Sequence, residues 1–180
     1  MTGGPGAGKT TVLEELATLG FRYAPEAARE IIREQAASGG SALPWGDRQA
    51  YTDLMLDRSI ESFEEHTSAT GPIFADRGIP DTLGYARLIG LCNTREIERA
   101  CGEYRYASLV FTAPPWEEIY CVDTERKQDF EEAQRTYEVI CGVYREYGYE
   151  LIELPRCSAG ERARFILKRL SVNTISMDFA

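Results

Sequence analysis

The sequence is short of positive charge and has no long apolar run. Lysine and arginine together number 20 against 29 aspartates and glutamates, which gives a formal net charge of −9. This balance argues against a general nucleic-acid binder or a protein of anionic membranes, although a local basic site for one nucleotide is compatible with it. No stretch approaches the roughly 20 apolar residues of a membrane span, and no secretory leader pattern is present. The expected partner is a small molecule.

Cysteine occurs without any C-x-x-C pair, and histidine occurs once. The five cysteines are an odd number and fall mostly within apolar patterns: Cys92, Cys101, Cys121, Cys141 and Cys157. This distribution predicts reduced, buried packing residues in a cytoplasmic protein. His66 stands near the end of a predicted helix, and we interpret it as a polar or helix C-terminal residue rather than a catalyst.

The first eleven residues carry the strongest pattern in the chain. Gly3, Gly8, Lys9 and Thr10 fit the phosphate-binding motif G-x-x-x-x-G-K-[ST], whose glycines let successive backbone N–H groups point at an anion. Lys9 is expected to reach the β- and γ-phosphates, and the Thr10 hydroxyl is expected to bind Mg²⁺. The motif therefore predicts a site for ATP and Mg²⁺. The residues expected to contact the nucleotide are Gly3, Gly4, Pro5, Gly6, Ala7, Gly8, Lys9, Thr10 and Thr11.

The strand that normally leads into such a loop is almost absent. Only Met1 and Thr2 precede Gly3, whereas the loop usually follows a buried strand at the centre of a parallel sheet. We therefore expect the first strand to be truncated or missing in this chain, with unpaired ladder groups on its neighbours.

The rest of the chain alternates between strand and helix patterns, as one domain over residues 1–180. Short apolar runs predict strands at 21–24, 72–75, 108–113 and 150–154. Helical spacing predicts helices over 10–19, from 26 onward, over 47–66 with Asp47 as N-cap, over 83–89, 94–104 and 130–147, and after a Ser158–Glu161 capping box. This alternation predicts a three-layer α/β fold with a parallel sheet and right-handed crossovers.

Polar residues follow the second and third predicted strands. Asp76 is a candidate for holding Mg²⁺ or accepting a proton, and Arg77 is a candidate for clamping phosphate oxygens; an ion pair in a surface turn is the alternative. Glu26 competes with Asp76 for the role of base, and its alternative is a helix N-terminal carboxylate stabilised by the helix dipole. Arg29 is expected either to pair with Glu26 or to bind substrate. Glu26, Asp76 and Arg77 are expected at the carboxyl edge of the sheet, where ligands of open α/β folds bind.

Two further segments are candidates for closing the site. A charged stretch at about 114–135 predicts a basic lid, with Arg126 as the first choice for charge over the phosphates and Arg135 as the second; a solvated charge run is the alternative. The helix over 47–66 is expected to wall an acceptor pocket. Tyr51 and Arg58 are its candidates, and packing or surface positions are the alternative for both.

With these residues in place, the chain resembles P-loop kinase-like NTPases of the AAA-domain predicted ATPase group, which are related to nicotinamide-riboside kinases and to nucleoside and nucleotide kinases. The segments that carry the resemblance are 3–11, 25–29, 74–81 and 148–155. It implies a mostly parallel five-stranded sheet with helices on both faces, and an adenine site near the turn after Leu154-Pro155. It also implies a base at Glu26, and roles in Mg²⁺ and phosphate binding for Asp76 and Arg77.

Several motifs of related classes are absent. The chain shows no separate Walker B motif and no sensor or ring-forming arginine module, which disfavours oligomeric remodelling, and no N-K-x-D sequence that would specify GTP. The first hypothesis is therefore a small-molecule kinase that transfers the γ-phosphoryl group of ATP to a nucleoside-like or nucleotide-like acceptor. The alternative is a nucleotide-dependent switch or regulatory ATPase that acts through a protein partner. The oligomeric state is left open.

Overall fold

The computed structural model describes residues 1–120 and 129–174, with side chains through residue 170. Its elements in chain order are β1 (Thr2–Gly3), α1 (Lys9–Thr18), β2 (Arg22–Ala24), α2 (Ala27–Ser38), α3 (Arg48–Thr67), β3 (Ile73–Ala75), α4 (Ile79–Leu88), α5 (Arg95–Glu103), β4 (Leu109–Ala113), the 3₁₀ turn η1 (Glu117–Ile119), α6 (Phe130–Glu146), β5 (Glu150–Glu153) and α7 (Ala159–Thr174). The predicted alternation of strands and helices is confirmed.

The strands are parallel, but they do not form the single five-stranded sheet that we predicted. They form a three-stranded sheet of order β1-β4-β5 and a two-stranded sheet of β2 and β3. The division has a simple cause, because β1 has only two residues and cannot form a ladder on both sides. Two backbone hydrogen bonds link Met1 to the other sheet, from its amino group to Ala75 O at 2.8 Å and from Arg77 N to Met1 O at 2.8 Å.

The strand before the phosphate loop is thus present, although it is very short. Thr2 pairs with Thr112 and Gly3 with Ala113 of β4. Gly3 has a φ of 142°, and a Cβ atom at this position would lie 2.3 Å from Ala113 O. Only glycine fits there, so the first glycine of the loop also permits the close approach of β1 to β4.

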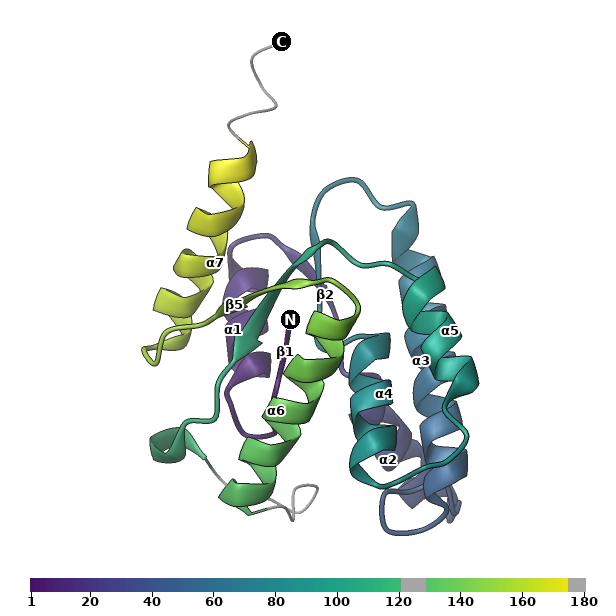
Figure 1. Ribbon diagram of the computed structural model, residues 1–180. Helices are drawn as coiled ribbons and strands as arrows, with labels where there is room; N and C mark the ends of the chain where they lie inside the picture. The colour runs from purple at the N-terminus through teal and green to yellow at the C-terminus, as the bar shows by residue number, and fades with distance from the viewer. Residues whose placement is uncertain (121–128, 175–180) are drawn as a thin grey trace.

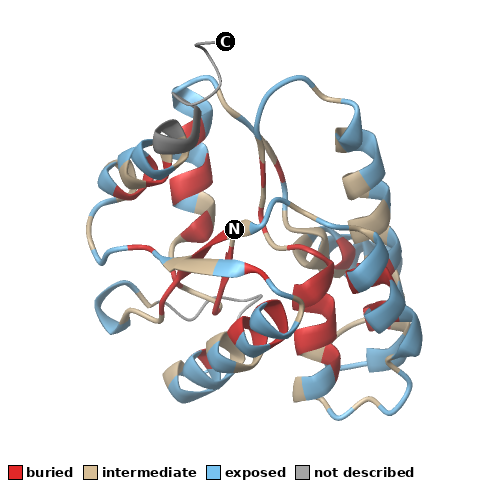
Figure 2. Ribbon diagram, turned by 45° about the horizontal axis from the view of Figure 1, so that its top comes forward, coloured by how far each residue is buried: buried red, intermediate tan, exposed pale blue. Residues whose placement is uncertain are grey.

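Helices cover both faces of the strands, as predicted. In Figure 1, α1 and α7 lie together on one side, α6 lies in front of β1, and α2 to α5 form a group on the other side. Successive residues of β4 point to opposite faces: Phe111 packs with Val12 and Leu13 of α1, and Val110 packs with Ile140 of α6. Buried residues accordingly concentrate in the central strands and on the inner faces of the helices (Figure 2).

Most helix boundaries follow the sequence signals. Asp47 caps α3 by accepting a hydrogen bond from Ala50 N at 3.0 Å, and the Glu161 carboxylate accepts one from Ser158 N at 3.0 Å at the start of α7. The clearest difference is α4, which begins at Ile79 rather than near residue 83. The sequence of this first helical turn contains Pro80 and resembles a loop. Proline is nevertheless favoured in the first turn of a helix.

The cysteine prediction is only half right. Cys101 and Cys141 are buried, as expected, but Cys92 is exposed and Cys157 is half-buried. Cys121 lies outside the described residues. In the described part of the chain, no helix is both long and apolar enough to cross a bilayer.

Candidate functional site

The phosphate loop connects β1 to α1 and turns around the Lys9 side chain. The Lys9 ammonium donates to Gly3 O at 3.3 Å and to Gly4 O at 2.9 Å, and the residue is only 5% exposed. Burial and the nearby charge of Arg77 lower the pKa of Lys9 to about 8. Gly8, at the N-cap of α1, has a φ of 73°, which suits glycine and turns the chain from the loop into the helix. The lysine is therefore held at the helix N-terminus, where an anion is favoured.

Asp76 reaches the same place from the end of β3. The Thr10 hydroxyl donates to Asp76 Oδ2 at 3.3 Å, which unites two residues predicted to hold Mg²⁺. Asp76 Oδ1 is buried and has no hydrogen-bond partner among the described residues. Carboxylate and hydroxyl oxygens are suitable ligands for Mg²⁺, which usually keeps waters and phosphate oxygens as its other ligands. The pair therefore fits this ion, even though the described residues contain no cluster of three or more His, Cys, Asp or Glu side chains suited to a metal.

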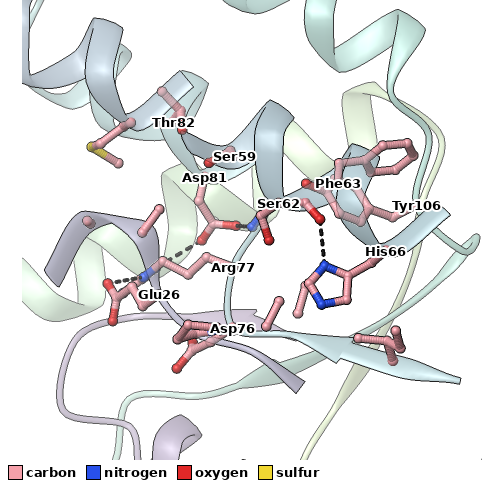
Figure 3. A pocket seen from close by; sticks show the side chains of 18 of the residues that line it. Glu26, Ser59, Ser62, Phe63, His66, Asp76, Arg77, Asp81, Thr82 and Tyr106 are labelled. Carbon is pink, nitrogen blue, oxygen red and sulfur yellow. Dashed lines mark hydrogen bonds and ion pairs between the residues drawn. The ribbon is translucent and has the colours of Figure 1, made fainter. Parts of the chain in front are cut away.

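Arg77 forms the centre of an ionic network beside the loop (Figure 3). Its Nε donates to Glu26 Oε1 at 2.7 Å, and its Nη1 donates to Asp81 Oδ1 at 2.9 Å and to Gly3 O at 3.0 Å. Arg77 has a φ of 74°, the only positive φ of a non-glycine residue in the described chain. Such a conformation is costly for a long side chain, and the three hydrogen bonds hold it in place. The predicted proximity of Glu26, Asp76 and Arg77 is thus present in the structure.

The Glu26 carboxylate is doubly ion-paired. Its second oxygen, Oε2, lies 3.1 Å from Arg29 Nε, so the pairing alternative foreseen for Arg29 is present. Burial alone would raise the pKa of Glu26, but the charges of Arg77, Lys9 and Arg29 outweigh it and lower this pKa to about 2. The carboxylate is therefore ionised at neutral pH and a weak proton acceptor.

Asp81 is a member of the network that the sequence analysis did not select. It is 2% exposed and accepts four hydrogen bonds, from Thr2 Oγ1 at 2.6 Å, Arg77 Nη1 at 2.9 Å, Gly78 N at 3.0 Å and Tyr144 OH at 2.7 Å. One signal for it existed, because an acidic residue three positions after Gly78 suits the N3 position of a helix. Asp81 joins β1, β3, α4 and α6 behind the phosphate loop.

A first cavity lies on the outer side of the loop. Its volume is about 470 Å³, and it is lined by loop residues from Gly6 to Thr11 and by Arg29, Trp116, Ile119, Cys157, Ser158, Ala159 and Arg162. The cavity adjoins the turn at which the resemblance implies an adenine site. Arg162, which the sequence analysis also missed, is 2% exposed and donates to Ala7 O and Pro155 O, each at 2.9 Å. Its guanidinium lies 4.8 Å from the centre of the Trp116 ring, so it links the loop to the wall of this cavity.

A second cavity lies on the inner side of the loop, between α2, α3, α4 and α6. Its volume is about 620 Å³, and Lys9, Glu26, Arg77 and Tyr51 are among its lining residues. Tyr51 thus occupies the predicted acceptor wall. Arg58 does not line this cavity: it is an exposed residue paired with Glu34 at 2.8 Å, which supports the surface alternative.

The predicted lid is described only at its two ends. Residues 114–120 include η1, and residues 130–135 form the first turns of α6. Arg135 lines the inner cavity. Arg126 lies outside the described residues, so its role stays a prediction.

His66 lies away from the phosphate loop, in the last turn of α3. Its Nδ1 is 2.6 Å from Ser62 O, and the side chain lines a third cavity of about 360 Å³ behind Arg77 (Figure 3). This position agrees with a helix C-terminal residue.

A phosphate loop between a strand and a helix, a carboxylate at the neighbouring strand end and helices on both faces of parallel strands define the P-loop NTPase fold of the kinase type. The chain belongs to the AAA domain family, whose profile matches residues 1–162. No match was found among curated proteins.

Two solved kinases have a similar fold. A thymidylate kinase from Ehrlichia chaffeensis has a TM-score of 0.62 and 16% identity, over 94% of this chain and 96% of that chain. A shikimate kinase from Acinetobacter baumannii, solved in complex with shikimate, has a TM-score of 0.58 and 21% identity, over 96% of this chain and 91% of that chain. At these identities the likeness establishes the fold and does not identify a substrate.

Proposed function

We propose that this protein transfers the γ-phosphoryl group of ATP to a hydroxyl or phosphate of a small acceptor. The observation that carries the proposal is the position of Lys9 and Arg29, which line both the outer and the inner cavity. A nucleotide in the outer cavity would place its terminal phosphate at the boundary, and an acceptor in the inner cavity would face it. Phosphoryl transfer depends mainly on such positioning and on charge stabilisation.

Each charged residue has a distinct place in this proposal. Lys9 and the loop N–H groups would bind the β- and γ-phosphates, and Thr10 and Asp76 would hold Mg²⁺, which neutralises charge on the phosphates when bound. Arg77 already uses Nε and Nη1, so its Nη2 would serve a phosphate oxygen. In the lid, Arg126 would add positive charge next to the β- and γ-phosphates.

Glu26 is better suited to positioning than to proton abstraction. Its two oxygens bind Arg77 and Arg29, and its pKa of about 2 is far from the value near neutrality that favours a general base. We assign Glu26 to orienting the two arginines, and Asp76 to the metal. The attacking oxygen needs little activation when the transition state is loose.

The acceptor cavity suits a nucleoside-like or nucleotide-like molecule. Its volume of about 620 Å³ lies within the range of small-ligand sites. The resemblance to nucleoside, nucleotide and nicotinamide-riboside kinases suggests a test panel of nucleosides, nucleoside monophosphates and vitamin-derived ribosides, and the similar fold of a shikimate kinase adds shikimate to it. The cytoplasmic location expected from the sequence also stays a proposal, which fractionation of the producing cells would test.

An acceptor screen distinguishes this proposal from a nucleotide-dependent switch. ADP release would be measured with ATP, with and without Mg²⁺, in the presence of each acceptor. The kinase proposal predicts Mg²⁺-dependent ADP release that rises with at least one acceptor. Release that no small acceptor stimulates, but that a protein fraction does, would favour the switch.

A further inference from the structure

We infer that the acceptor of the proposed kinase carries an anionic group, a carboxylate or a phosphate ester, which Arg48 and the Tyr85 hydroxyl bind inside the inner cavity. The inference rests on the proposed function and specifies the substrate class of the same site. Neutral acceptors such as free nucleosides are thereby disfavoured.

The charge of the cavity is the first support. Five basic and three acidic side chains line it, namely Lys9, Arg29, Arg48, Arg77, Arg135, Glu26, Asp81 and Glu132. This excess of positive charge occurs in a chain with a net charge of −9. A basic site within an acidic molecule favours a negatively charged ligand.

Four of these eight charged side chains are already paired. Glu26 binds Arg77 and Arg29, and Asp81 also binds Arg77. Among the described residues, Arg48 and Arg135 have no ion pair with a carboxylate. Arg48 at the start of α3 and Arg135 on α6 are both exposed, and they remain available to bind an anion in this cavity.

Tyr85 on α4 provides the second, independent support. Its hydroxyl is buried and has no hydrogen-bond partner in the described part of the chain, although the residue lines the cavity. A buried hydroxyl without a partner costs free energy, and a ligand oxygen that reached it after a small shift of the neighbouring side chains would satisfy it. Tyr85 and Arg48 both line this cavity, and the charge of Arg48 offsets part of the rise that burial causes in the pKa of Tyr85.

Titration with simple anions tests the site without knowledge of the acceptor. The probes are inorganic phosphate and acetate, and their binding is measured by titration calorimetry at low ionic strength. The protein is first saturated with ADP and Mg²⁺, so that the phosphate loop is occupied. We expect at least one probe to bind the wild type. The same probe should bind about tenfold more weakly to the Arg48→Gln variant and severalfold more weakly to the Tyr85→Phe variant. The tighter probe would distinguish a phosphate ester from a carboxylate.

Matched variants keep the result interpretable. Arg58→Gln removes an exposed arginine of the same helix, outside the cavity, and should bind the probes like the wild type. Tyr85→Phe removes an unsatisfied hydroxyl, so its melting temperature should not fall. Binding of neither probe, or equal binding to wild type and Arg48→Gln, would overturn the inference.

The acceptor screen separates this inference from the proposed function. Efficient phosphorylation of neutral acceptors, unaffected by Arg48→Gln, would overturn the anionic acceptor and leave the kinase intact. Anion binding that depends on Arg48 and Tyr85 would support the site even if no member of the panel were phosphorylated, an outcome that would count against the kinase alone.

Discussion

Lys9 illustrates how burial changes a single residue before any ligand binds. Its pKa is lowered to about 8, whereas a phosphate group would favour the charged form. We therefore expect ATP affinity to fall as the pH rises above about 8, by up to about tenfold per pH unit. Calorimetric titration from pH 7 to 9.5 measures this. A Lys9→Ala variant should bind more weakly and lose the pH dependence; a flat profile in the wild type, or an identical fall in the variant, would contradict the account.

Glu26 should affect stability in acid. Its folded pKa of about 2 lies below the ordinary value of 4.5, so the unfolded state binds more protons between these pH values. The stability that ionised Glu26 contributes is complete above about pH 4.5 and declines as the pH falls toward 2. We expect Glu26→Gln to lower the unfolding free energy at pH 7 by about 3 kcal/mol, because Arg77 loses a buried partner.

Urea unfolding of the wild type and Glu26→Gln at pH 7, 4.5 and 3 measures both effects. The difference between the two proteins should shrink as the pH falls from 4.5 to 3. A constant difference over this range would show that Glu26 is not the titrating group.

The sequence placed some of these residues and missed others for physical reasons. Glu26, Asp76 and Arg77 follow strands, and the carboxyl ends of parallel strands meet at one edge, so their proximity could be predicted. Asp81 and Arg162 lie on helices, where the chain order alone does not determine which residues face the loop. Their contacts depend on how α4 and α7 pack.

At the scale of elements, α4 and α6 are joined by packing and by one buried hydrogen bond. Tyr144 on α6 donates to Asp81 Oδ2 at 2.7 Å, and both residues are buried. Burial and the charge of Asp81 raise the pKa of Tyr144, so the hydroxyl keeps its proton and acts as the donor. This hydrogen bond connects the helix behind the phosphate loop to the helix that carries Arg135.

Tyr144→Phe should therefore destabilise the protein with little change in shape. Hydrogen bonds to charged groups contribute about 1.5 to 3 kcal/mol, and we expect a loss of this size. Denaturant unfolding gives the value. Tyr147→Phe is a suitable control, because its hydroxyl donates to Glu98 O at 3.3 Å in an exposed position and its loss should cost less. Equal losses in the two variants would contradict the importance of the buried bond.

The elements themselves were more predictable than their pairing. Apolar periodicity predicted each strand and α-helix that the structure describes beyond the phosphate loop, although not the turn η1, and Asp47 was predicted as the cap of α3. It did not predict that the parallel strands would divide into two sheets, because this depends on the two residues of β1. The earlier start of α4 was missed because Gly78 and Pro80 resemble a turn until Asp81 is seen to cap the helix.

At the scale of the whole molecule, the phosphate loop separates two cavities. The outer cavity is bounded by α7 and the turn before it, and the inner cavity by α2, α3, α4 and α6. Helices from distant parts of the chain thus meet around Lys9. This arrangement, rather than any one residue, is the basis for proposing transfer between two bound molecules.

Mass detection of the product tests this account most directly. The protein would be incubated with ATP, Mg²⁺ and the acceptor panel, beside Lys9→Ala protein whose folded state is checked by circular dichroism. The account predicts an acceptor carrying one additional phosphoryl group with the wild type, and at least about a hundredfold less with Lys9→Ala. Consumption of ATP that yields only inorganic phosphate, or equal product from the folded variant, would contradict it.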